Sequence, residues 1–104
     1  MELSELHSEL EKLEMPVAYN HFDEKTKLPF ILYLCRKSKN IFADNVVYRK
    51  YTTVEIELYT LKKDLVKENQ VEDLLNKNEI PFQITSEMFL ENEKMYRVVY
   101  EIFI

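Results

Sequence analysis

The chain has 104 residues and a formal net charge of −5, with 46% hydrophobic and 12% aromatic residues and no glycine. Its length fits one domain, residues 1–104, and the apolar content excludes a disordered chain. The lack of glycine excludes phosphate-cradling loops, dinucleotide fingerprints and nucleophile elbows, because each needs backbone conformations that glycine adopts most cheaply.

The N-terminal part of the chain is expected to hold a helix and two strands. Four leucines recur at spacings of three and four and predict an apolar helix stripe that packs on the domain's own sheet: Leu3, Leu6, Leu10 and Leu13. Ser4 is the expected N-cap, and Pro16 ends the helix. A brief strand is expected at 17–19, and a strand at 30–35 has apolar residues on both faces.

The middle of the chain carries its clearest strand, because residues 52–61 alternate apolar and polar side chains. Before it, residues 36–40 are expected to form a polar hairpin loop, and Asp44 with Asn45 is a turn signal. Without glycine, Asn and Asp are expected to occupy the left-handed positions. The residues alone leave open whether 41–48 forms one bent strand or a small separate ribbon.

The C-terminal half is expected to add a helix and a closing hairpin. Asp64 is placed to cap a helix that runs to about residue 78, and strands at 82–90 and 95–104 pair around a polar turn. The element order α-β-β-β-α-β-β predicts an α+β fold, an antiparallel sheet with two helices packed on one face.

The last strand has apolar residues on both of its faces. Met95, Val99 and Phe103 alternate with the core-facing residues and would therefore lie on the side of the sheet without helices. Monomers rarely leave such a patch open. Either a neighbouring subunit covers it, or the segment 17–22 of the same chain does.

Charge is distributed unevenly along the sequence. Residues 1–14 carry five acids and one Lys, residues 23–50 three acids and seven Lys or Arg, and residues 64–79 five acids and two Lys. Segments of opposite sign can dock copies of a chain head to tail, although solvated faces give the same pattern.

Catalytic and ligand-binding motifs are not found, so we expect no enzyme, no metal and no cofactor. His7 and His21 lack zinc-ligand spacing, and Cys35 has no recognisable partner base. Glu55 and Glu57 share a strand face, as solvated acids commonly do. The acidic net charge argues against holding DNA, and residues 29–35, the longest apolar run, are too short to span a membrane. A single cysteine fits a reducing cytosol.

Several pieces of the chain, in order and spacing, resemble the tail-completion proteins of long-tailed bacteriophages, the tail terminator or tail-to-head joining family. These pieces are Leu28-Pro29-Phe30, Phe42-Ala43-Asp44-Asn45 with Val47-Tyr48, Ile56-Glu57-Leu58-Tyr59-Thr60 with Lys62-Lys63-Asp64, and Glu93-Lys94-Met95-Tyr96 to Tyr100-Glu101. The resemblance implies a small α+β sheet with two helices. It also implies a homo-oligomeric ring, commonly a hexamer, that lies between the tail tube protein and the head-connector protein.

The resemblance implies further that DNA passes through the ring only as cargo and that the protein resides in the virion tail, after assembly in the host cytoplasm. Asp44, Asn45 and Tyr48 would lie on a projecting loop or ribbon, and Lys62, Lys63 and Asp64 form a second candidate contact. Asp44 and Asn45 have an alternative role as turn formers, and Asp64 as a helix cap. The alternative function is a small cytosolic protein-binding or regulatory module of phage or prophage origin.

Overall fold

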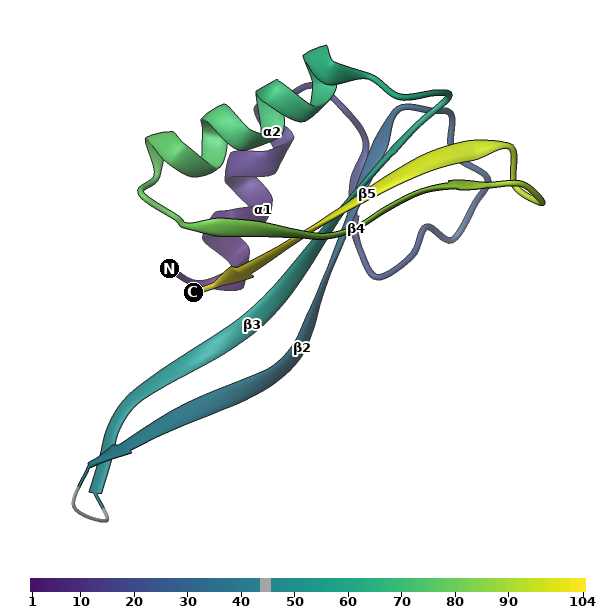
Figure 1. Cartoon of the computed structure of the whole chain (residues 1–104). Coiled ribbons are helices and arrows are strands. Elements are labelled where there is room, and N and C mark those ends of the chain that lie inside the picture. Colours follow the sequence, from purple (N-terminus) through teal and green to yellow (C-terminus); the bar gives the residue numbers. More distant parts are fainter. Residues whose placement is uncertain (44–45) are drawn as a thin grey trace.

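A computed structural model describes residues 1–43 and 46–104, with the backbone alone for residues 37–43 and 46–51. The order along the chain is α1 (Leu3–Glu11), β1 (Val17–Tyr19), β2 (Phe30–Ala43), β3 (Val46–Thr60), α2 (Leu65–Lys77), β4 (Phe82–Leu90) and β5 (Met95–Phe103). This is the predicted α+β order, and both helices lie on one side of the sheet (Figure 1).

The sheet has the strand order β1-β2-β3-β5-β4. All neighbouring pairs are antiparallel except β1 and β2, so the predicted antiparallel sheet is mixed. β1 and β2 are parallel because the loop after Tyr19 carries the chain back to the end of the sheet at which β1 began. β2 therefore starts in the same direction as β1. The brief strand at 17–19 and the closing hairpin are confirmed.

The pairing of β2 with β3 is longer than predicted. Residues 36–40 belong to β2, so the predicted polar hairpin loop there is wrong, and the two strands pair along their length as far as Ala43 and Val46. Beyond about Cys35 and Thr52, neither strand has another neighbour among the strands that the structure describes, and this two-stranded ribbon projects from the rest of the molecule (Figure 1). The backbones of the two strands pair with each other here although residues 36–40 are polar and lack the apolar alternation of a half-buried strand.

The first helix begins earlier than expected. Glu2, not Ser4, is the N-cap residue, with an extended backbone and its N–H bound to the Glu5 carboxylate at 3.1 Å. An N-cap at Glu2 places Leu3 within the first turn, whereas a cap at Ser4 would exclude it from the stripe. Leu6 and Leu10 are fully buried, and Leu3 and Leu13 pack against the core.

The second helix starts as predicted and ends in a Schellman motif. The Asp64 side chain accepts a hydrogen bond from the Lys67 backbone N–H at 3.1 Å, which confirms it as the cap. At the other end, Ile80 N–H donates to Leu75 C=O and Glu79 N–H to Asn76 C=O. Glu79 takes the left-handed position at φ 57°, the place where glycine is usual.

Left-handed residues elsewhere also differ from the prediction. Over residues 1–43 and 46–104, the positive-φ positions are held by Glu14, Asn20, Glu79 and Lys94, so only one of them is Asn and none is Asp. The chain therefore accepts a local conformational cost of about 1 kcal/mol at such sites.

The core lies between the helices and one face of the sheet. It joins the leucines of α1 to Val71, Leu74 and Leu75 of α2 and to alternate residues of the three central strands, which are Ile31, Tyr33, Val54, Ile56, Leu58, Val98, Tyr100 and Ile102. The Tyr100 hydroxyl donates to the Glu72 carboxylate at 2.9 Å. Because β strands alternate, the residues between these core positions lie on the opposite face.

Candidate interaction surfaces

The side of the sheet away from the helices, which we call the helix-free face, is built from alternate residues of β2, β3 and β5. It carries Leu32, Leu34, Glu55, Glu57, Tyr59, Met95, Arg97, Val99, Glu101 and Phe103, with Gln83 and Met88 of β4 at its border. No described helix covers this face (Figure 1).

The three apolar residues predicted on this face differ in their burial. Val99 is only 5% exposed, whereas Phe103 is 41% exposed and Met95 is half-buried. The segment after β1 covers one end of the face, where Phe22 packs edge-on against Phe30 and Phe30 stacks on Tyr59. The intrachain alternative therefore accounts for that end, and Phe103 and Met88 at the other border keep substantial exposure.

Tyr59 is tied to the acidic part of the face. Its hydroxyl donates to the Glu57 carboxylate at 2.9 Å, and burial, together with that carboxylate, raises the pKa of Tyr59 to about 12. Glu57 is thus satisfied within the chain.

Two acids on the helix-free face oppose each other. Glu55 and Glu101 are directly paired across β3 and β5, an arrangement that destabilises a sheet because the carboxylates repel. Glu55 has an ion pair with Arg36 at 3.6 Å, while the Glu101 carboxylate has no hydrogen-bond or ion-pair partner within the described part of the chain. The fold itself does not require this pair of charges.

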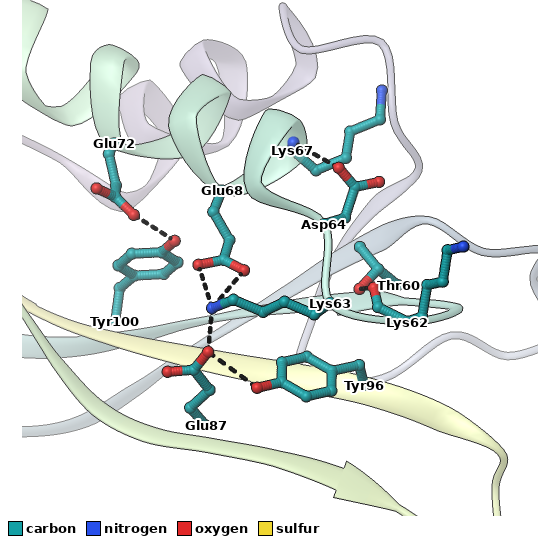
Figure 2. A network of polar contacts seen from close by, with 10 residues as sticks. All are labelled: Thr60, Lys62, Lys63, Asp64, Lys67, Glu68, Glu72, Glu87, Tyr96 and Tyr100. Atoms are coloured by element: carbon teal, nitrogen blue, oxygen red, sulfur yellow. Dashed lines mark hydrogen bonds and ion pairs between the residues drawn. The ribbon is translucent and has the colours of Figure 1, made fainter.

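The predicted contact Lys62-Lys63-Asp64 lies at the junction between β3 and α2, where Figure 2 shows three different roles. Asp64 caps the helix. The Lys63 ammonium donates to the Glu68 carboxylate at 3.0 Å and also binds Glu87, which accepts from the Tyr96 hydroxyl at 2.9 Å.

This cluster strongly favours the charged forms of its members. The hydrogen bonds that Lys63 donates to Glu87 and then to Glu68 raise the pKa of Lys63, and the bond from Lys63 lowers the pKa of Glu87. Lys63 therefore has a structural role between α2 and β4. Lys62 instead points away from the cluster, is exposed, and has no ionic partner among the described residues (Figure 2).

Large apolar side chains surround Lys62 in a way that the sequence reasoning missed. Leu61, Leu65 and Val66 are 69%, 63% and 66% exposed, and residues 61–66 line an open depression of about 550 Å³. We call Leu61, Lys62, Leu65 and Val66 the junction patch. A signal was present, since Leu65 and Val66 fall off the buried stripe of the helix that follows.

The projecting ribbon is the third candidate surface. Residues 36–51 include five Lys or Arg and one acid. The backbone of Tyr48 lies in this ribbon, and Asp44 and Asn45 lie outside the described residues.

Residues considered for chemistry are held apart. His7 shares a hydrogen bond with the Tyr33 hydroxyl at 2.8 Å, His21 lies beside Asp23, and Cys35 is a free thiol on β2. Within residues 1–43 and 46–104, no three His, Cys, Asp or Glu side chains come together in a way that could hold a metal ion.

Among the described helices, none is both long enough and apolar enough to cross a bilayer. No protein-family model matches the chain, and no curated protein matches it either.

Proposed function

We propose that this chain is a structural assembly protein that oligomerises into a ring at the head-proximal end of a phage tail tube and joins the tail to the head connector. The observation that carries the proposal is the helix-free face, where exposed apolar side chains lie beside an opposed pair of carboxylates. Both features are unfavourable in a monomer, because monomers rarely leave large apolar patches exposed and like charges directly opposite each other destabilise a sheet. A neighbouring subunit that supplies apolar contacts and a cation makes both favourable.

The ribbon of β2 and β3 supports the same role. It extends the molecule to 49 Å in its longest dimension, against 27 and 26 Å in the others, and no other described strand pairs with its backbone edges. Unpaired edges are templates for pairing with another chain. The resemblance to tail-completion proteins adds the partners: copies of the chain in a ring, the tail tube protein, the head-connector protein, and DNA as passing cargo.

The test is complementation of particles that lack this chain. Deleting its gene from the phage or prophage that encodes it should leave filled heads and separate tails, which electron microscopy distinguishes from joined particles. Purified protein added to such an extract should restore joined particles. Joined, infectious particles in the deletion strain would refute the proposal.

The junction patch favours a second candidate, a small protein-binding module of phage or prophage origin. Three apolar residues that are each more than 60% exposed are suited to contact a partner protein of any kind. This function predicts normal particle assembly without the chain, so the same deletion separates the two candidates.

A further inference from the structure

Two exposed apolar surfaces of this chain lie on different sides of the molecule. The junction patch follows the last residue of β3, where the chain turns toward the side of the sheet that carries α2 (Figure 1). The helix-free face looks the other way. A single copy cannot bring them together, because Thr60 and Asp64 fix the short connection at its two ends through hydrogen bonds to Lys62 C=O and Lys67 N–H.

The two surfaces are also opposite in charge. Lys62 lies at the centre of the junction patch, is exposed, and has no ionic partner among the residues that the structure describes, whereas Lys63 beside it is already bound to Glu68 and Glu87. The helix-free face presents Glu101 opposite Glu55, and within residues 1–43 and 46–104 Glu101 has no hydrogen-bond or ion-pair partner, whereas Glu55 is paired with Arg36. An ammonium placed between these carboxylates would relieve their repulsion, and the leucines and valine around it would meet the apolar border of the same face.

We infer that the junction patch of one copy packs on the helix-free face of the next copy, with Lys62 directed toward Glu101 and Glu55. This inference rests on the proposed function and specifies the contact within the ring. The contact is heterologous, because two different surfaces meet, so it repeats from subunit to subunit and closes into a ring when the rotation allows.

The alternative arrangement, in which two helix-free faces meet, is opposed by the same charges. In a symmetric pair the same surface lies on both sides of the interface, so the acidic residues Glu55 and Glu101 are present on both sides and no lysine of the junction patch is supplied to them. Like charges brought together at an interface cost affinity. A symmetric dimer would also bury the helix-free face of both subunits, so that no such face would remain to bind further subunits.

The first experiment captures the contact with single cysteines in full-length protein, with Cys35→Ala as the common background. Val66→Cys marks the junction patch, and Gln83→Cys marks the helix-free face, because Gln83 is exposed and paired with Glu101 in the sheet. A short bis-maleimide should cross-link a mixture of the two proteins and leave each one alone as monomer. Lys77→Cys, exposed at the far end of α2, replaces Val66→Cys in the control mixture and should not cross-link.

The second experiment exchanges charges in otherwise unaltered protein. Lys62→Glu and Glu101→Lys should each weaken self-association about fivefold or more in sedimentation velocity, and the double variant should recover most of the loss. Lys77→Glu, with the same charge change away from both surfaces, should leave association unchanged.

Three results overturn the inference: no cross-link above the control mixture, cross-linking of Gln83→Cys with itself, or a double variant no better than the single ones. If wild-type protein still restores joined particles in that case, the proposed function stands and only this interface is wrong. If it restores none, the proposed function fails as well.

Discussion

The contact that most clearly links α2 to the end of the sheet is the cluster of Lys63 with Glu68 and Glu87. Removing it should lower the free energy of unfolding by an amount that the burial of its members sets. The Glu68 side chain is 5% exposed and Lys63 is 42% exposed, so the pair is half-buried. Exposed ion pairs contribute about 0–1 kcal/mol, while removing one partner of a fully buried pair costs about 3–5 kcal/mol. Because solvent screens the half-exposed Lys63, we expect Lys63→Met to lower the free energy of unfolding by an amount between these ranges, about 2 kcal/mol.

Most of that loss should come from the carboxylate left behind rather than from the missing attraction. Lys63→Met leaves a buried Glu68 without its cation, so Glu68→Gln in the same protein should recover about half of the lost stability. Urea denaturation of the single and double variants measures both the stability lost in Lys63→Met and the part that Glu68→Gln recovers. The melting temperature of Lys63→Met should fall by about 10 °C.

Lys67→Met is the matched control, because the Lys67 side chain has no ionic partner in the part of the chain that the structure describes. It should change the free energy of unfolding by no more than about 0.5 kcal/mol. The reasoning is refuted if Lys63→Met costs no more than this control, or if adding Glu68→Gln makes the protein still less stable.

Three further predictions concern single residues. Glu79→Gly should raise the free energy of unfolding by about 1 kcal/mol in urea denaturation, because glycine adopts the left-handed end of α2 without strain, and an unchanged or lower stability would contradict this. Glu101→Gln should stabilise the monomer by about 0.5 kcal/mol while it weakens self-association, since it removes the repulsion from Glu55; a loss of stability would count against an opposed charge pair. Lys63 lowers the pKa of Glu87 below the ordinary 4.5, so the stability this contact adds is present above pH 4.5 and is lost as the pH falls through the folded-state pKa. The difference in unfolding free energy between wild type and Glu87→Gln should accordingly shrink below pH 4.5, and a constant difference would be inconsistent with it.

The elements with strong local patterns were predictable from the sequence. The alternation of β3, the leucine stripe of α1 and the Asp64 cap each depend on neighbouring residues only, and the structure confirms them. The strand at residues 36–40 was not predictable because these residues show no apolar-polar alternation, and their pairing with β3 is a contact with another part of the chain. The N-cap was misassigned because Ser4 is the better capping residue in isolation, whereas burial of the leucine stripe requires an earlier start.

The candidate surfaces were less accessible to sequence reasoning. That the helix-free face would carry Met95, Val99 and Phe103 follows from strand alternation, but the burial of Val99 depends on side chains from other strands. The role of Lys63 depends on Glu87, which lies 24 residues away and meets it only in the folded chain. The exposure of Leu61, Leu65 and Val66 likewise depends on the direction in which the chain leaves β3.

The most direct test of the proposed ring is an electron cryo-microscopy reconstruction of the head-proximal end of the tail, in particles of the phage whose genome encodes this chain. We expect a closed ring of several copies in which the helix-free face of each subunit is covered by its neighbour and the ribbons reach toward adjoining proteins. A tail end without this protein, or a single copy whose helix-free face remains in solvent, would contradict it.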